Sequence, residues 1–534
     1  MPDASVLVVY TQPMDAVECS ITTYNKKQGI NWINADKISE FQGQLVTFNV
    51  AAVLDLCRAN NLMPPSNLVS VEAVLKQISG LPKDQKGAHE WYFWMCLKRH
   101  WSHEHITIDR AREIVLSKSS PEDEEELKAI LEAISLSFYS LWQELIVELE
   151  NRSELNRFKK IESAVQRIFQ RREVLGVRVD LEQGELMLQK VKQEKYDAFQ
   201  ALAEDFDINP SLLNIRELAT ALPRTDAHFL APYAGYPSFI EYLKLARSRS
   251  RFANNFLKYH DAHRSFSTIQ RLIASKGRVF PHFSTFGTVT GRILVETPPL
   301  QFLKKRFRAL ICADEDFVLS YLDYSQFEPG ILASLSDDKA LVKCYNQDDL
   351  YSSLSTVLFG SAVHRKDAKR AFLGFIFGMS ANNLAALIST EDADIPVQRK
   401  RIDDFFGRFQ GLITYQEDQK KKFQELGYLE SLDGNRRYRL SGGDLTPKET
   451  RWACNHQIQS SGSLIFKSAI IALAKEFGDK AILLPMHDAV LMQWPNDEYK
   501  NERCEKAKLI MKQAFSEFCP EVVPIVTEED FALA

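Results

Sequence analysis

The stretch AILLPMHDAVLMQW, residues 481–494, carries an ionisable pair, His487-Asp488, in the middle of an apolar run. Apolar residues on both sides predict a β-hairpin with the pair at its tip. A second apolar run, FVLSYLDYSQFEPG (317–330), ends in Asp323. Carboxylates from two such strands can clamp two divalent cations, so Asp323 and Asp488 are candidate Mg²⁺ ligands. Either aspartate taken alone is more simply read as a turn residue.

Length and composition limit the number of domains and the class of protein. A chain of 534 residues predicts two to four domains, and 45% hydrophobic with 26% charged residues is ordinary for a globular enzyme. The eight cysteines form no CxxC pair, which disfavours a zinc site and favours a reducing compartment. No signal peptide and no apolar run of about 20 residues is evident. We therefore expect a cytoplasmic protein without a membrane span.

Charge is informative only locally. The formal net charge is −5, which does not indicate a nucleic-acid binder by itself. Between residues 271 and 310, however, eight basic residues stand against one acid, Glu296. Such a block favours a surface for a polyanion, and the alternative is an ordinary solvated face.

A second pattern lies in HRKDAKRAFLGFIFGMS, residues 364–380. Arg365, Lys369, Leu373 and Phe377 recur every four residues and so share one slowly drifting helix face. Two cations followed by an apolar and an aromatic residue suit a nucleoside triphosphate laid along the helix, with its phosphates at the cationic end. An amphipathic helix with a basic end fits the pattern equally well.

The wider pattern predicts mixed structure. We expect mixed α/β elements over 1–80, long helices over 120–200, and a second, interrupted helical group over about 180–275. Turn-rich strands are expected from 276, helices over 337–428, and then a hairpin, a long helix and a second hairpin. The first long helix is expected to have Pro121 at its first helical position, directly after Ser120.

Six stretches together resemble the motifs of family A DNA polymerases, the bacterial DNA polymerase I type. DYSQFE (323–328), RKDAKRAFLGFIFG (365–378) and MHDA (486–489) resemble its A, B and C motifs. TVTGR (288–292), GYLESLDG (427–434) and NHQIQSSGSLIFK (455–467) resemble three further elements. The resemblance runs from about residue 170 to the C-terminus and implies an α+β right-hand fold. It also implies a template-directed DNA polymerase acting in DNA replication or repair.

The resemblance implies roles residue by residue. Two Mg²⁺ ions, with Mn²⁺ as a substitute, would be held by Asp323, Asp488 and the Tyr324 carbonyl. Lys369 would bind the triphosphate and donate a proton to the leaving pyrophosphate, and Glu328 would select deoxyribose. The remaining dNTP contacts would be Arg365, Leu373, Phe377, Gln326 and Tyr351. The primer–template contacts would be Arg292, Gln301, Asn455, Gln459, His487 and Arg436, with the segment 244–252 tracking phosphates.

Several positions depart from the family pattern. Ala489 stands where the family has a glutamate, so we expect a looser metal site and altered metal preference. Leu373 replaces an aromatic, and Phe377 replaces a tyrosine whose phenol could hydrogen-bond Glu328. Further departures are Tyr351 for a histidine, Asn435 for an arginine, and Pro329-Gly330 for Leu-Arg. These changes point to a divergent branch, of phage, plasmid or other mobile-element type.

The N-terminal part resembles a 3′–5′ exonuclease domain with an RNase H-like fold, but without its acids. Val53 and Ser70 occupy two positions where the exonuclease has a carboxylate. At a third such position the chain at best keeps an acid, Glu132. Two-metal hydrolysis would then lack ligands, so we expect no proofreading. The alternative is an unrelated α/β domain.

The expected architecture is a degenerate exonuclease-like domain over 1–165, a thumb over 166–275, a palm from 276–345 and 430–534, and fingers over 346–429. The expected partners are primer–template DNA and dNTPs, with a monomeric chain and accessory replication proteins. Two alternatives remain open: a catalytically weakened primer–template binding protein, and a nucleotidyl transferase that needs no template.

Overall fold

A computed structural model describes residues 4–12, 15–81, 92–209, 240, 243–244, 247, 250–347, 349–389 and 395–533. The chain forms two compact units. Unit 1 comprises residues 1–175, 281–301 and 316–530, and unit 2 comprises residues 176–280, 302–315 and 531–534. Of the segment 244–252, which was predicted to track phosphates, residues 245, 246, 248 and 249 lie outside the described residues.

Unit 1 begins with a five-stranded mixed sheet in the order β3-β2-β1-β4-β5. The three N-terminal strands pair antiparallel, whereas β4 and β5 join in parallel, which confirms the predicted α/β pattern. The strands are β1 Ser5–Gln12, β2 Asp15–Asn25, β3 Gly29–Trp32, β4 Leu45–Thr47 and β5 Leu68–Ser70. Alternate residues of β1 enter two different cores, so both faces of the sheet are covered.

Helices α5 (Glu124–Asn151) and α1 (Val50–Ala59) contribute to these two cores. The other helices of this region are α2 Val71–Ser79, α3 Phe93–Leu97, α4 Ile108–Val115, α6 Leu155–Arg157 and α7 Ser163–Leu175. We predicted that helix α5 begins directly after Ser120, and this prediction is wrong. Its N-cap is Asp123, whose side chain accepts from the Glu126 N–H, with three glutamates in the first turn.

By length and composition α5 could also cross a membrane, and it is the only such helix among the described residues. In its most apolar window, 61% of the residues are buried inside the protein. Leu131, Phe138 and Trp142 are fully buried in the core beside β1. This burial is typical of a core helix.

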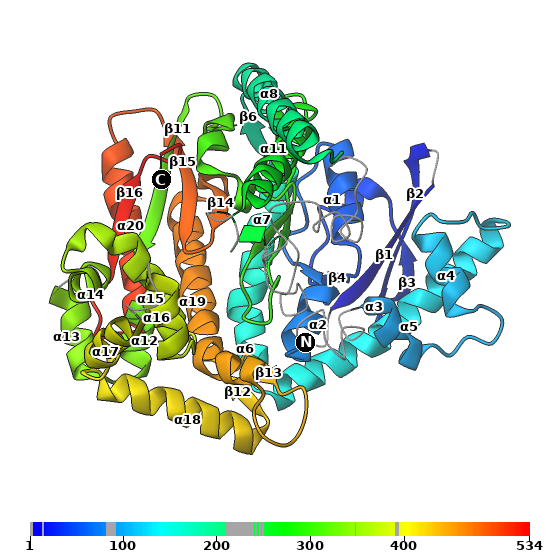
Figure 1. Ribbon diagram of the computed structural model, residues 1–534. Helices are drawn as coiled ribbons and strands as arrows, with labels where there is room; N and C mark the ends of the chain where they lie inside the picture. Colours follow the sequence, from blue (N-terminus) through cyan, green and yellow to red (C-terminus); the bar gives the residue numbers. More distant parts are fainter. Residues whose placement is uncertain are drawn as a thin grey trace. The chain divides into compact units, whose positions relative to one another are not determined.

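A four-stranded antiparallel sheet, in the order β14-β15-β11-β16, forms the second centre of unit 1. Its strands are β11 Phe317–Ser325, β14 Ile482–Met486, β15 Ala489–Pro495 and β16 Ile525–Glu529. The predicted hairpin at 481–494 is therefore confirmed. Helices α12 (Phe327–Leu335), α19 (Pro447–Phe477) and α20 (Lys500–Phe518) pack with this sheet and with one another (Figure 1).

Gly330 explains one departure from the family pattern. A Cβ at this position would lie 2.8 Å from the Tyr345 ring and 3.0 Å from Phe515. Pro329 is tolerated beside it because it occupies the first turn of α12, where backbone N–H groups lack intrahelical partners.

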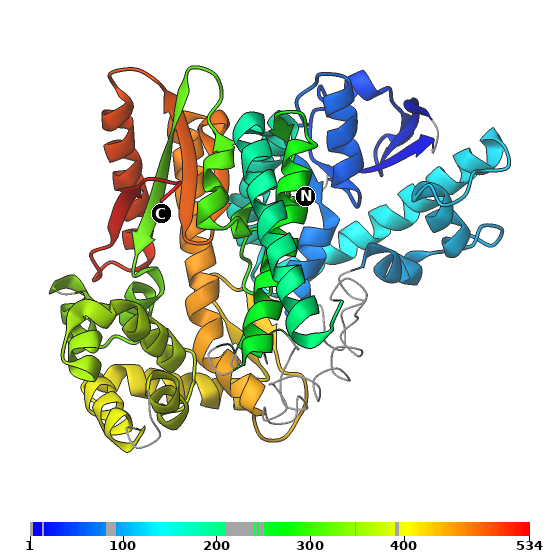
Figure 2. The same ribbon diagram turned by 45° about the horizontal axis from the view of Figure 1, so that its top comes forward.

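The helices between residues 339 and 426 gather into one cluster, as both ribbon views show (Figures 1 and 2). They confirm the helical character predicted for this segment. Their bounds are α13 Lys339–Gln347, α14 Leu350–Phe359, α15 Arg365–Ile376, α16 Ala381–Ile388, α17 Ile395–Phe406 and α18 Gln410–Leu426. Two small hairpins complete unit 1, with strands β8 His282–Ser284, β9 Leu294–Thr297, β12 Tyr428–Glu430 and β13 Arg436–Tyr438.

Unit 2 is built on two long helices, α8 (Leu181–Phe206) and α11 (Arg251–Ile273), which lie side by side (Figure 2). A three-stranded sheet in the order β10-β6-β7 accompanies them. Its strands are β6 Val177–Val179, β7 Arg278–Val279 and β10 Ile311–Cys312.

Candidate nucleotidyl-transfer site

The two candidate metal ligands come from neighbouring strands. In the β11–β15 ladder Asp323 lies directly opposite Ala489, and Asp488 precedes Ala489 in the chain. Met486 pairs with Ala489, so His487 and Asp488 alone form the turn between β14 and β15. Both aspartates are half-buried. The sheet thus brings together the two acids that the sequence separates by 165 positions.

Burial raises the pKa of Asp488. Its own backbone N–H and the charges of Lys369, His487 and Arg292 act in the opposite direction. A half-buried carboxylate whose ionised form is opposed by desolvation gains most from a cation close by.

The donor set fits magnesium. Two carboxylates with a backbone carbonyl match a cation that takes one or two carboxylates and completes its shell with water and phosphate oxygens. The described residues contain no group of three or more His, Cys, Asp or Glu side chains placed to hold a metal ion. Tyr324, whose carbonyl is the third candidate, is anchored through its hydroxyl, which donates to the Met511 carbonyl at 2.5 Å.

Helix α15 presents Arg365 and Lys369 on its exposed face, followed by half-buried Leu373 one turn further on. Phe377 follows as the C-cap, so the helix ends sooner than the predicted 365–378. Beneath the two cations lies the Tyr351 ring, at 5.2 Å from the Arg365 guanidinium and 5.7 Å from the Lys369 ammonium. Tyr351 is 2% exposed, and its ring supports the cations through its π face.

Sequence reasoning missed the partner of Arg365. The Asp349 carboxylate accepts from its Nη2 at 2.6 Å and also caps α14 by accepting from the Ser352 N–H. Burial raises the Asp349 pKa, but Arg365 and the helix N–H groups outweigh it and hold the pKa below its usual value. A helix-start signal in DDLYSS marks Asp349 as a cap, yet nothing local indicates the ion pair.

Gln326 and Glu328 lie where β11 turns into α12. Gln326 has a left-handed backbone, with φ of +52°, and its side-chain oxygen accepts from the Leu350 N–H at 3.0 Å. Its carbonyl end is therefore committed to α14. Glu328 is paired with Arg292, and burial raises its pKa against the charges of Arg292 and Lys369.

Two of the predicted DNA contacts, Arg292 and Gln459, line one groove of about 680 Å³. Asn455 is half-buried one helical turn before Gln459 on α19. Lys76 and Tyr92, from the N-terminal region, line the same groove and were missed from sequence. No local pattern distinguishes these two from other surface residues.

Two other predicted DNA contacts, Gln301 and Arg436, are less available to a duplex. Gln301 is 4% exposed, and its amide donates to the Ile293 carbonyl at 3.3 Å, so it offers little surface to a duplex. Arg436 is paired with Glu430 at 2.6 Å and lies over the Tyr428 ring.

The basic block over 271–310 is partly neutralised in unit 2. Arg278 pairs with Asp314, Lys304 with Asp261, and Arg306 with Glu194. Arg271, Lys276 and Lys305 are exposed. The surface available to a polyanion is therefore less positive than the residue count indicates.

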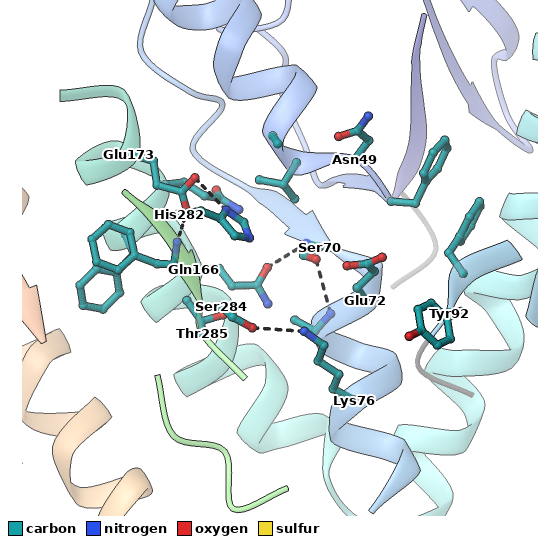
Figure 3. A pocket seen from close by; sticks show the side chains of 18 of the residues that line it. Asn49, Ser70, Glu72, Lys76, Tyr92, Gln166, Glu173, His282, Ser284 and Thr285 are labelled. Atoms are coloured by element: carbon teal, nitrogen blue, oxygen red, sulfur yellow. Dashed lines mark hydrogen bonds and ion pairs between the residues drawn. The ribbon is translucent and has the colours of Figure 1, made fainter. Parts of the chain in front are cut away.

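Of the three exonuclease-like positions, Ser70 lines a cavity of about 390 Å³ in unit 1, whereas Val53 and Glu132 do not. Asn49 and Ser70, the N-caps of α1 and α2, lie on its wall with Gln166 between the strand ends and β8 (Figure 3). Glu173 also lines it, where it accepts from the Phe283 N–H and contacts His282. Val53 is buried in α1 and Glu132 lies in α5.

Comparison with solved structures defines the class of fold. The chain is similar to the polymerase domain of Pol1 from M. smegmatis, solved in complex with DNA primer-template and dNTP. The TM-score is 0.77 at 20% sequence identity, and the match covers 100% of this chain and 97% of that one. The predicted right-hand polymerase fold of palm, fingers and thumb is confirmed.

A sequence model of DNA polymerase family A matches residues 180–531, and the chain belongs to this family. It is 27% identical over 428 residues to DNA polymerase I of Streptococcus pneumoniae serotype 4, and 26% identical over 421 residues to that of Bacillus subtilis. The thermostable DNA polymerase I of Thermus thermophilus is 25% identical over 402 residues. These alignments cover 70–72% of this chain but 46–47% of the relatives, so the chain spans about half their length.

Proposed function

We propose that this chain is a template-directed DNA polymerase that adds deoxynucleotides to a primer 3′ end, without proofreading. The observation that carries the proposal is the β11–β15 register. It sets Asp323 beside the turn that bears Asp488, within the electrostatic reach of Lys369 on α15. The relatives' names and the M. smegmatis complex support the same activity.

In this proposal Asp323, Asp488 and the Tyr324 carbonyl would hold two Mg²⁺ ions, with Mn²⁺ as a substitute. When bound, the ions would supply activation of the attacking hydroxyl and stabilisation of the leaving oxygen. The primer 3′ hydroxyl loses its proton to water as its oxygen bonds to the α-phosphorus, and the bond from the α-phosphorus to the α–β bridging oxygen breaks to release pyrophosphate. Lys369 donates a proton to the leaving group.

The incoming nucleotide lies along α15. Arg365 and Lys369 bind its phosphates, while Leu373 and Phe377 contact the sugar and base. Tyr351 supports the two cations from beneath, and Gln326 fixes the start of α14 next to the site. Glu328 occupies the space that a 2′ hydroxyl would need.

The DNA-binding part of the proposal rests on the groove. Arg292 and Gln459 read acceptors common to all base pairs in the minor groove, assisted by Asn455. His487 at the hairpin tip touches the primer end, and Arg436 has a peripheral role. Gln301 acts through the backbone, because it donates to the Ile293 carbonyl between the groove residues Arg292 and Leu294.

The domain assignment is part of the proposal. We assign the thumb to 166–275, the palm to 276–345 and 430–534, the fingers to 346–429 and the exonuclease-like domain to 1–165. The proposal also includes a monomeric, cytoplasmic enzyme used in replication or repair and helped by accessory proteins.

One primer-extension experiment tests the proposal. A labelled primer is incubated with dNTPs, with and without template, in Mg²⁺ and in Mn²⁺. We expect template-dependent extension that both Asp323→Ala and Asp488→Ala abolish. No extension in either metal would leave a primer–template binding protein, and extension without template would indicate a terminal transferase. Shortening of a mismatched primer would contradict the absence of proofreading.

A further inference from the structure

Glu328 is held by an arginine from a distant part of the chain. The Arg292 Nη2 donates to the Glu328 Oε1 at 2.5 Å, across 36 positions of sequence. The Glu328 side chain is 17% exposed and that of Arg292 is 40% exposed. A charge-assisted hydrogen bond at a site partly removed from water is stronger than one on an open surface.

The backbone that carries Arg292 is fixed on several sides. The Arg292 N–H donates to the Thr288 hydroxyl at 3.1 Å, and Gly291 adopts a φ of +74°. Ser463 on α19 donates to the Gly291 carbonyl at 2.6 Å, and the turn is also tied down by Asn435, whose amide donates to the Val289 carbonyl. Asn435, one of the departures from the family pattern, thus has a structural role. The arginine is presented from a rigid turn.

Phe377 ends α15 without a hydroxyl, so it supplies no donor for Glu328. Among the described residues, Arg292 is the one side chain whose hydrogen bond reaches Glu328. Nearby Asp488 repels the Glu328 carboxylate, while Arg292 and Lys369 attract it. Without Arg292, this carboxylate would be drawn toward Lys369 or would take up a proton.

We propose that Arg292 is a positioning residue for sugar selection, which holds the Glu328 carboxylate where it excludes a 2′ hydroxyl. The inference rests on the proposed polymerase function. It assigns to Arg292 the anchoring that a tyrosine hydroxyl at position 377 would otherwise give. The other donors of Arg292 remain open to the groove that it shares with Gln459.

The test is single-nucleotide incorporation by the full chain on a primer–template, with kcat/KM measured for a dNTP and for the matching rNTP. Arg292→Gln and Arg292→Lys remove the guanidinium fork. The matched control is Gln459→Ala, which removes a contact in the same groove but none to Glu328. We expect all three to lower dNTP incorporation. Only the Arg292 variants should lower the dNTP-to-rNTP ratio, by about 10- to 100-fold, as for loss of a charged hydrogen bond.

Two further variants separate positioning from general damage. Phe377→Tyr added to Arg292→Gln should restore much of the ratio, because it supplies a new donor. Arg292→Gln added to Glu328→Gln should change the ratio no further, because both act through one contact. An unchanged ratio in both Arg292 variants, or additive losses in the double variant, would overturn the inference. Failure of the unmodified chain to extend any primer would instead overturn the proposed function.

Discussion

Ala489 offers the sharpest test of the metal site, because it faces Asp323 across the ladder and is fully buried. Directly opposed residues place their Cβ atoms about 4.5–5.5 Å apart. A glutamate at this position would add a carboxylate close to Asp323. At about 5 Å and an effective dielectric constant near 20, the repulsion is about 3 kcal/mol. Solvent reaching half-buried Asp323 reduces this value, so it is an upper limit.

The change to make is Ala489→Glu, with Ala489→Gln as a control of equal size and no charge. Both variants must find room in the buried site, so their difference reports the charge. In a chelating buffer we expect the glutamate variant to unfold at lower urea than the glutamine variant. With Mg²⁺ the glutamate variant should instead unfold at higher urea than the glutamine variant, because a third carboxylate strengthens ion binding to the folded state.

Primer extension supplies the second readout. We expect Ala489→Glu to reach half-maximal rate at a lower Mg²⁺ concentration than the parent chain, and Ala489→Gln to show no such gain. Equal unfolding of the two variants in chelator, with no separation on adding Mg²⁺, would refute the placement of residue 489 beside a metal-binding Asp323.

Three other changes follow from the site and its supports. Asp349→Asn keeps a helix cap but removes the ion pair with Arg365, which is then available to the triphosphate. The KM for dNTP should therefore fall by up to about fivefold in steady-state kinetics. A rise in KM would contradict a phosphate-binding role for Arg365. Glu154 is fully buried, and burial raises its pKa to about 7. Its proton is therefore lost first in the unfolded chain, and stability to urea should fall between about pH 4.5 and pH 7; this slope should flatten in Glu154→Gln. His487 has a φ of +65°, which costs an L residue about 1–2 kcal/mol, so His487→Gly should raise the unfolding midpoint while lowering primer extension.

The elements that the sequence predicted well are those written in local patterns. Apolar runs on both sides of His487-Asp488 define a hairpin, and an i+4 repeat defines the face of α15. The predicted start of α5 failed because two caps compete within four residues, and Asp123 with its following glutamates is the stronger. Local competition of this kind is decided by small free-energy differences.

The side-chain partners could not be predicted, because they join segments that no local pattern relates. The pairing of Arg292 with Glu328 spans 36 positions, and the amide of Gln326 reaches 24 positions to Leu350. The groove residue Lys76 comes from a region outside the matched family segment. The resemblance supplied the candidate site residues, but the three-dimensional contacts were needed to show what each one touches.

The charges around the site argue that its departures are linked. Arg292 pairs with Glu328 and Arg365 pairs with Asp349, while Lys369, His487 and Arg292 all favour the ionised form of Asp488. An acid at position 489 would add a further negative charge opposite Asp323. Alanine there avoids this repulsion in the metal-free sheet but supplies no carboxylate to a metal ion. In the role proposed for Arg292, a charged donor both orients the Glu328 carboxylate and offsets part of the negative charge that Glu328 and Asp488 share.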